Sequence, residues 1–246
     1  MSVFLYSGQV NSSKTLGVSI ITCTNRPHFF NTLLNNFKRQ QYKVKELIII
    51  LNKKSMDLSE YRRKVSSFRN ISIFKLPEKV SLGSCLNFGI RKAKYSVIAK
   101  FDDDDYYSPN YLKEQVGALR RTGAGIVGKG AHLKFFERNR LLVMTTPSKK
   151  NKFVKYVAGG TLLFKKQLHN RVRFASLTLG EDVNFMRKSR ALGYKLFATS
   201  PYNFVGIRRK NKQSHTWKAS DKVVMKGSLF VAKTTNFRKW ADRPIK

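Results

Sequence analysis

The stretch Tyr95-Ser-Val-Ile-Ala-Lys-Phe-Asp-Asp-Asp-Asp105 joins a short apolar run to four consecutive aspartates. The whole chain of 246 residues contains only eight aspartates and carries a formal net charge of +35. Neighbouring carboxylates repel one another, so a run of this kind is typical of a place where a cation binds. The pattern predicts a buried strand that ends at a metal site.

The sequence before this stretch alternates between strand and helix patterns. Apolar runs at residues 17–23, 46–51 and 71–76 predict strands, and helical spacing of apolar residues follows Pro27 and recurs over 58–68. Ser81 is a typical N-cap for a further helix, which leads into the acidic stretch. This alternation predicts an α/β fold with a mostly parallel sheet and helices on both faces.

The pattern changes after a helix that begins at Pro109 and that we expect to end near Arg120. Short apolar runs at residues 125–127, 132–136, 141–144 and 161–164 predict strands of a smaller antiparallel sheet. Helical spacing returns at about residues 181–192. We expect a single domain over residues 1–207, followed by a basic segment, 208–246, that packs on the site or closes over it.

Composition argues against several classes of protein. No stretch approaches the roughly 18 to 20 apolar residues of a membrane span, and the N-terminus lacks the basic and apolar regions of a secretory signal. We therefore expect a soluble, cytoplasmic protein in which Cys23 and Cys85 are free thiols. The four histidines form no cluster with cysteine, so oxygen ligands are expected for any metal.

Positive charge is the second large feature, with 49 lysines and arginines against 14 acidic residues. Such a surface attracts polyanions, namely nucleic acid, anionic lipid headgroups or a phosphate-rich polymer. The basic residues are spread along the chain rather than gathered in a tail, which also fits a simple solvated surface. Charge alone leaves these alternatives open.

Three loops that follow predicted strands should meet at one edge of the sheet, because ligands bind beyond the carboxyl ends of parallel strands. These loops are residues 22–27, 51–54 and 102–105. If the acidic run is extended, Asp102 and Asp104 point one way while Asp103 and Asp105 point the other way. We expect the first pair to face a divalent cation, and a solvent-facing acidic loop is the alternative.

A second acidic pair, Glu181 and Asp182, follows Gly180 at the start of the last predicted helix. Carboxylates at a helix start also offset the unpaired N–H groups there, so this position alone does not define a site.

The motifs together resemble those of family 2 glycosyltransferases. Four segments carry the resemblance in the family's order and approximate spacing: Val18–Arg26, Gly83 with Asn87, Phe101–Pro109, and Gly180–Asp182. The likeness extends over about residues 17–200, and Ser214–Trp217 is similar to a segment in some members. It implies the GT-A fold, which is Rossmann-like, with a nucleotide-binding half over about 17–122 and an acceptor half over about 123–207. It also implies transfer of a sugar with inversion.

The resemblance assigns a role to each matching residue. Asp104 and Asp102 would bind the metal, with Asp102 nearer the ribose, and Asp182 would be the general base. Glu181 and Trp217 would lie on the acceptor side. The expected nucleotide-sugar-binding residues are Thr22, Thr24, Arg26, Asn52, Gly83, Asn87, Asp102 and Asp103. Three further residues, Arg208, Arg209 and His215, are expected to close over the diphosphate.

Two departures from the family pattern concern the donor. Asn52 stands where many members carry an aspartate that contacts uracil, and Leu86 stands where an arginine is common. An amide still donates and accepts hydrogen bonds, so a UDP-sugar remains the favoured donor.

The sequence thus predicts an inverting glycosyltransferase that depends on Mn²⁺ or Mg²⁺ and acts in polysaccharide biosynthesis. Its charge favours an anionic glycan or a lipid-linked acceptor, with peripheral association at the inner face of an anionic membrane as an open possibility. One alternative, a sugar-phosphate nucleotidyltransferase, would need a glycine-rich loop that residues 22–30 lack. The other, a basic nucleic-acid-binding module, has no zinc-finger or RNP-type motif here to support it.

Overall fold

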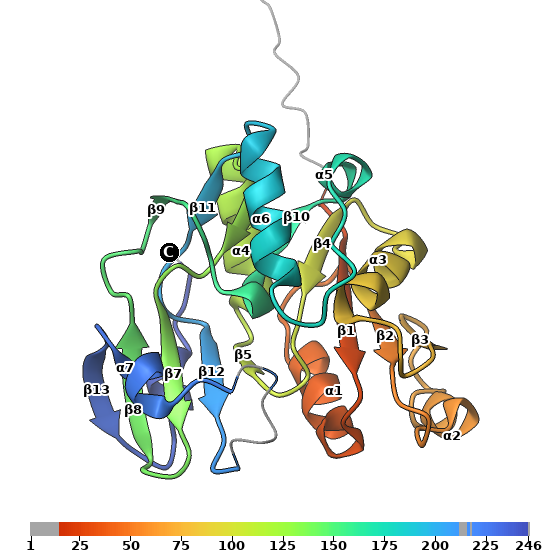
Figure 1. Cartoon of the computed structure of the whole chain (residues 1–246), viewed down its shortest axis with the longest axis horizontal. Helices are drawn as coiled ribbons and strands as arrows, with labels where there is room; N and C mark the ends of the chain where they lie inside the picture. Colours follow the sequence, from red (N-terminus) through yellow and green to blue (C-terminus); the bar gives the residue numbers. More distant parts are fainter. Residues whose placement is uncertain (1–14, 212–215, 217, 246) are drawn as a thin grey trace, which may run out of the picture.

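The computed structural model describes residues 15–211, 216 and 218–245 (Figure 1). Its larger sheet has eight strands in the order β3-β2-β1-β4-β10-β6-β11-β9. The first four strands are β1 (Val18–Thr24), β2 (Lys45–Leu51), β3 (Ile71–Lys75) and β4 (Val97–Lys100), and they are parallel. The parallel half that the sequence predicts is therefore present.

The central strands are apolar on both faces because helices cover both faces. The first helical elements are η1 (Pro27–Phe29), α1 (Phe30–Lys38), α2 (Leu58–Lys64) and α3 (Leu82–Lys92). Side chains of α1 and α2 pack into one hydrophobic cluster with Ile49, while side chains of α3 pack into the other cluster with Ile48 and Ile50. Ser81 caps α3 as predicted, because its hydroxyl accepts a hydrogen bond from Ser84 N at 3.3 Å.

The remaining strands of the larger sheet come from the second half of the chain. α4 (Tyr111–Thr122) ends at Gly123, whose φ of 63° favours glycine. The strands that follow are β6 (Ile126–Gly128), β9 (Lys152–Val154), β10 (Leu163–Lys165) and β11 (Leu196–Ala198). β10 lies antiparallel between β4 and β6.

The assignment of residues 125–127 and 161–164 to a smaller sheet was therefore wrong. The cause is packing: Ile126 and Val127 of β6 and Phe164 of β10 are fully buried, because helices cover both faces of the larger sheet here as well. The elements that flank β10 are η2 (Gly159–Thr161) and α5 (Lys166–Arg171), and α6 (Glu181–Ala191) follows. Figure 1 shows α6 on the near face of the sheet, with the loop from α5 running between α6 and α3.

The smaller sheet has five strands in the order β13-β8-β7-β12-β5. They are β5 (Tyr106–Tyr107), β7 (His132–Phe136), β8 (Leu141–Thr145), β12 (Phe204–Arg208) and β13 (Leu229–Lys233). The predicted strands at 132–136 and 141–144 are thus in this sheet, where they pair antiparallel. β7 and β12, however, are parallel.

The described part of the C-terminal segment is built onto this smaller sheet. β13 pairs with β8, while α7 (Asp221–Met225) packs against the sheet through Val224. α8 (Arg238–Ala241) contributes Ala241 and Trp240 to the cluster on the opposite face. The predicted division of the chain at residue 207 stays a prediction.

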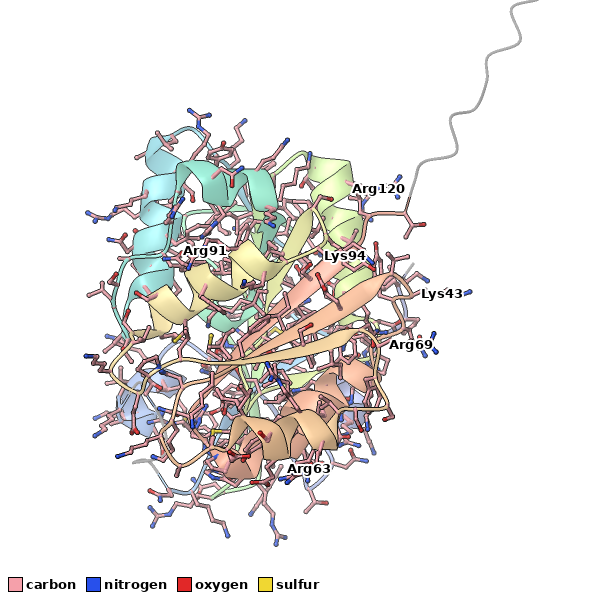
Figure 2. All side chains as sticks on the ribbon, turned by 90° about the vertical axis from the view of Figure 1, so that its right-hand side faces the viewer. Lys43, Arg63, Arg69, Arg91, Lys94 and Arg120 are labelled. Carbon is pink, nitrogen blue, oxygen red and sulfur yellow. The ribbon has the colours of Figure 1, made fainter. Side chains whose placement is uncertain are left out.

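The basic residues are distributed over the surface. Figure 2 shows six of them pointing outward around the β3 edge of the larger sheet: Lys43, Arg63, Arg69, Arg91, Lys94 and Arg120. In the described part of the chain, no helix has both the length and the apolar character to cross a membrane.

Candidate active site

A cavity of about 800 Å³ opens at the carboxyl ends of β1, β2 and β4. Its walls include the loop after β1, the turn at Asn52 and Lys53, and all four aspartates after β4. The start of α6 and the strands β7 and β12 form the other sides. The three loops therefore meet as predicted, and Glu181 and Asp182 line the same cavity.

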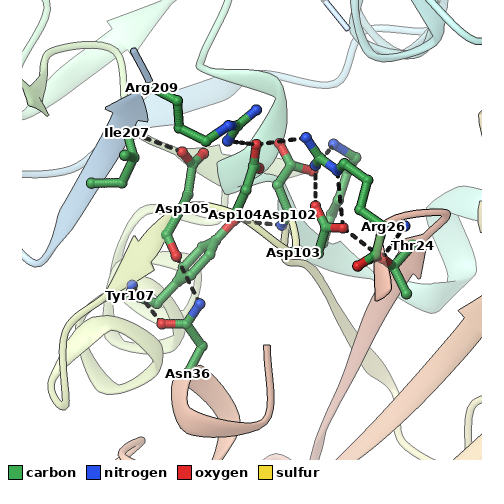
Figure 3. Close-up of polar contacts among 11 residues, drawn as sticks. Thr24, Arg26, Asn36, Asp102, Asp103, Asp104, Asp105, Tyr107, Ile207 and Arg209 are labelled. Carbon is green, nitrogen blue, oxygen red and sulfur yellow. Dashed lines mark hydrogen bonds and ion pairs between the residues drawn. The ribbon is translucent and has the colours of Figure 1, made fainter. Parts of the chain in front are cut away.

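Asp103 is bound to the loop after β1 (Figure 3). Thr24 Oγ1 donates to Asp103 Oδ2 at 2.6 Å, and Arg26 Nε donates to the same oxygen at 3.3 Å. The carboxyl group is only 2% exposed, and burial raises its pKa to about 6, with the neighbouring Asp104 acting in the same direction. Asp103 thus holds Thr24 and Arg26 in place, and it also lines the cavity.

Asp104 lies between two arginines. Arg26 Nη1 donates to Asp104 Oδ2 at 2.9 Å, and Arg209 Nη1 donates to the same oxygen. Burial opposes ionisation of this carboxyl, but the two guanidinium groups outweigh it and lower the pKa of Asp104. This wall of the cavity therefore carries a carboxylate that attracts cations.

The acidic run is bent rather than extended, so the predicted alternation of its side chains is only partly correct. Bends occupy residues 103–105, and Asp103 and Asp104 share Arg26 instead of pointing in opposite directions. Asp105 does turn away, since its carboxylate accepts a hydrogen bond from Ile207 N of β12 at 2.8 Å. Asp105 therefore joins the acidic loop to the smaller sheet.

Asp102 is more accessible than Asp103 or Asp104. Its side chain is 35% exposed, and Oδ1 accepts from Lys100 Nζ at 2.6 Å. Its backbone N–H donates to the Tyr107 hydroxyl at 2.8 Å, and that hydroxyl donates to Gly160 O at 2.6 Å. These contacts fix Asp102 against the turn that contains Gly160.

The second acidic pair begins α6 after Gly180, whose φ is 82°. Asp182 is partly exposed, and its Oδ1 accepts from Val183 N at 2.7 Å, as a carboxylate at a helix start commonly does. Glu181 is 4% exposed, and burial raises its pKa to about 7 against the opposing effect of Lys100. Of the two carboxyl groups, Asp182 is the one that a ligand in the cavity reaches more readily.

Lys100 connects the two acidic segments, and sequence reasoning missed it. Burial would lower the pKa of its ammonium group, but Asp102, Glu181 and Asp182 raise it. The available signal was a charged residue at the end of the apolar β4, where a buried lysine needs an anionic partner.

Gly159 and Gly160 were also missed. A Cβ on Gly160 would lie 2.5 Å from Asp102 Oδ2, and a Cβ on Gly159 would overlap the Asp182 carboxylate. These glycines let both carboxylates approach the backbone closely. The adjacent glycine pair was visible in the sequence, but the contacts that require it come from distant segments.

Three predicted nucleotide-binding residues lie outside the cavity lining. Thr22 is buried within β1 and 1% exposed. Gly83 N donates to Leu177 O at 2.9 Å, and Asn87 Nδ2 donates to Phe174 O at 2.8 Å. Gly83 and Asn87 therefore hold the segment before α6, and their predicted contact with a nucleotide-sugar stays a prediction. Asn52 does line the cavity, and its Nδ2 donates to Pro77 O at 2.7 Å.

The predicted diphosphate-binding residues divide into three cases. Arg209 reaches the site through Asp104. Arg208 lines the cavity, although its Nε donates to Asp221 Oδ1 at 3.1 Å, away from the aspartate run. His215 lies outside the described residues, as does Trp217, which was predicted on the acceptor side.

Asp102 and Asp104 carry the carboxylate oxygens that a hard divalent cation prefers, and Arg26 and Arg209 occupy Asp104 Oδ2 in this structure. Among residues 15–211, 216 and 218–245, no group of three or more His, Cys, Asp or Glu side chains is arranged to hold a metal ion. A cation bound by Asp102 and Asp104 would take its other ligands from water or from a bound phosphate.

Comparison with known proteins identifies the family. Residues 19–213 match the family described as Glycosyl transferase family 2. The chain therefore belongs to glycosyl transferase family 2, which confirms the prediction from its motifs. The match favours this reading over the nucleotidyltransferase and the nucleic-acid-binding module.

Two curated relatives agree with this assignment. The O-antigen biosynthesis glycosyltransferase WbnJ of Escherichia coli is 29% identical over 161 residues, which are 61% of this chain and 62% of the relative. An uncharacterized glycosyltransferase of Rickettsia conorii is 30% identical over 112 residues, which are 46% of this chain and 18% of the relative. The chain thus spans less than two thirds of the length of either protein.

Solved structures confirm the predicted GT-A fold. TarS 1-349 of S. aureus in complex with UDP-GlcNAc has a TM-score of 0.64 at 16% identity, and the match covers 86% of this chain and 64% of that one. The mannosyltransferase PcManGT from Pyrobaculum calidifontis, in complex with GDP-Man and Mn²⁺, has a TM-score of 0.60 at 16% identity. That match covers 83% of this chain and 59% of PcManGT.

Proposed function

We propose that this protein transfers a sugar from a nucleoside-diphosphate-sugar to an acceptor hydroxyl, with inversion at the sugar and with help from a divalent metal. The observation that carries the proposal is the meeting of two acidic segments in one cavity. Asp102 and Asp104 line one side, Asp182 lines another, and the buried Lys100 interacts with both segments. A donor between them would have its diphosphate near one segment and its reacting sugar near the other.

The donor half of the proposal rests on Asn52, Arg26 and Arg209. Asn52 lies at the end of β2 in the cavity wall, and its amide oxygen is a suitable acceptor for the N–H of a uracil base. This supports a UDP-sugar, and the neighbour TarS was solved with UDP-GlcNAc. Arg26 and Arg209 both contact Asp104. Both would therefore lie near a diphosphate that is held by a cation at this carboxylate.

Asp102 and Asp104 would hold Mn²⁺ or Mg²⁺, and the neighbour PcManGT was solved with Mn²⁺. Such a cation stabilises the negative charge that develops on a departing diphosphate. Arg209 and Arg26 add positive charge on the same side of the cavity.

Asp182 is the proposed general base. Its carboxylate lies in the cavity wall against Gly159, where it can accept the proton of an acceptor hydroxyl. Inversion requires this hydroxyl to attack the anomeric carbon from the face opposite the diphosphate. Glu181 stays largely buried beside it and shapes the acceptor side of the cavity.

Lys134 supports an anionic acceptor. It lines the cavity from β7, and among the described residues no side chain forms a hydrogen bond or an ion pair within 4.0 Å with it. Burial lowers the pKa of its ammonium group, against the attraction of Asp105. A carboxylate or phosphate on the acceptor would give this half-buried amine an anionic partner in direct contact. We extend the proposal to acceptors carried by glycans or lipids at an anionic membrane.

A thermal-shift screen tests the donor half. UDP, GDP and their sugars are added to the full chain with Mn²⁺ or with EDTA, because a ligand that binds the native state raises the melting temperature. We expect a rise with a uridine nucleotide and Mn²⁺ that is absent with EDTA. No rise with any nucleotide would contradict the proposed function.

A further inference from the structure

The rim of the cavity beside Asp182 is apolar. Leu177, Leu179 and Val183 are 45%, 61% and 48% exposed, and Leu179 also lines the cavity. The described residues include nine exposed large hydrophobic side chains, and three of the nine fall within residues 177–183. We call these three side chains the apolar rim. Such clustering at the mouth of a polar cavity is typical of a contact surface.

The apolar rim is held in place by the body of the protein. Leu177 O accepts a hydrogen bond from Gly83 N at 2.9 Å, and Leu177 N donates to Ala175 O at 2.7 Å. Ser176 is bonded to Ser84 at the start of α3 at 3.1 Å. Val183 belongs to the first turn of α6. The start of α3 therefore holds the loop that carries Leu177 and Leu179, and α6 carries Val183.

The helix that carries Val183 is basic beyond its first turn. α6 contains Arg187, Lys188 and Arg190. The two acidic residues of α6 are Glu181 and Asp182, and both line the cavity. Arg187 is exposed and lies one helical turn from Val183 on the same face of α6. Beyond its first turn, the outer face of α6 thus adds only positive charge next to Val183.

That combination matches one kind of partner. A free, polar glycan gains little from contact with two leucines and a valine, whereas the boundary of a lipid bilayer accepts apolar side chains. Anionic headgroups attract lysines and arginines near the surface, and this attraction acts together with apolar insertion. Charge complementarity therefore favours an anionic membrane over a neutral one.

We propose that the apolar rim inserts into the surface of an anionic membrane, which turns the mouth of the cavity toward an acceptor carried by that membrane. The inference rests on the proposed function, because it takes Asp182 as the base that the acceptor must reach. It adds the surface by which the protein meets the membrane.

The test uses the full chain and two kinds of vesicle, phosphatidylcholine alone and phosphatidylcholine mixed with phosphatidylglycerol. We expect cosedimentation with the mixed vesicles and little with phosphatidylcholine alone. The double variant L179S/V183S should bind the mixed vesicles on the order of tenfold more weakly, because each removed side chain loses its transfer out of water. Both positions are exposed, so the melting temperature should change little.

The matched control is L229S/F230S, which removes two apolar side chains that are 56% and 70% exposed at the far edge of the smaller sheet (Figure 1). It should bind vesicles like the parent. Equal binding by the parent and the rim variant, or equal loss in both variants, would overturn the inference.

Donor binding separates this inference from the proposed function. If the parent does not cosediment with anionic vesicles while a uridine nucleotide with Mn²⁺ still raises its melting temperature, the membrane inference is wrong and the proposed function stands. If the rim variant alone loses vesicle binding but no nucleotide binds the parent, the surface is correct and the proposed function is wrong.

Discussion

The ammonium nitrogen of Lys100 lies 2.6 Å from a carboxylate oxygen of Asp102 at the end of β4, and the lysine side chain is only 6% exposed. Burial disfavours a charged amine, yet Asp102, Glu181 and Asp182 hold the pKa of Lys100 above its ordinary value. Two acidic segments that are distant in the sequence therefore share one buried cation. Removal of the Lys100 ammonium group should therefore affect both acidic segments.

Lys100→Met should destabilise the protein, because three carboxylates lose the cation between them. We expect the free energy of unfolding at pH 7 to fall by about 1 to 3 kcal/mol, less than for a fully buried pair. The partial exposure of Asp102, 35%, is the reason for the lower figure. Urea unfolding measures the change. The control is Lys64→Met. Both side chains of the Lys64–Glu60 ion pair are exposed, so its loss should change the free energy of unfolding little. Equal effects of the two substitutions would contradict a special role for Lys100.

Glu181 should make stability depend on pH. Burial raises its pKa from 4.5 to about 7, so the native state holds this proton more tightly than the unfolded chain does. The resulting stabilisation is complete below about pH 4.5 and is lost as the pH rises through about 7. The total stabilisation lost across this pH range is roughly 3 kcal/mol.

Comparison with Glu181→Gln isolates this effect, because Asp103, whose pKa is about 6, titrates in the same range in both proteins. The unfolding free energy of the variant should rise relative to that of the parent between pH 5 and pH 7. A constant difference across this range would show that Glu181 has an ordinary pKa.

The sequence was sufficient for the parallel half of the fold. The strands there are rich in apolar residues, and β1, β2 and β3 are each followed by helical elements, with a recognisable start at Ser81 for α3. The short runs after Gly123 were harder, because apolar character does not say which sheet a strand joins. Phe164 lies between β4 and β6 as a result of a long-range pairing with Ile98 and Ile126.

The candidate site was predictable where a short motif was itself unusual enough to indicate a binding or catalytic role. The aspartate run and the Glu181-Asp182 pair are of this kind. Gly83 and Asn87 were given ligand contacts by resemblance, whereas their hydrogen bonds go to the segment before α6. Lys134 could not be found, because its importance depends on β7 facing the cavity.

Gly160→Ala tests the close contact between the turn and Asp102. The added methyl group would lie 2.5 Å from Asp102 Oδ2, so the carboxylate must shift. We expect a loss of about 1 to 3 kcal/mol in unfolding free energy, together with weaker binding of UDP and Mn²⁺. Gly206→Ala is the control in the same cavity, since its Cβ would meet no atom closer than 3.5 Å. If both variants behave alike, the Gly160 contact is unimportant.

Asp104→Asn removes a charge while keeping the size of the side chain. The variant should lose the part of the UDP-induced thermal shift that depends on Mn²⁺, because a neutral amide is a poor ligand for a hard cation. Arg26 and Arg209 also lose their shared anionic partner, so the melting temperature without ligand should fall as well. Isothermal titration with UDP, in Mn²⁺ and in EDTA, separates the two effects. An unchanged difference between these conditions would place the metal elsewhere.

Asp182→Asn should separate donor binding from transfer. The amide retains the hydrogen bond from Val183 N, whose length is 2.7 Å, so α6 should keep its start and the variant should fold. UDP and Mn²⁺ should bind as in the parent, because Asp104 and its arginines are intact. Transfer should fall by roughly 10²- to 10⁴-fold, the usual contribution of a positioned general base. The measurement is release of UDP from the donor sugar with acceptor present, at several pH values. Retained turnover in this variant would move the base to another residue, and Glu181 would be the first to examine since it lines the same cavity.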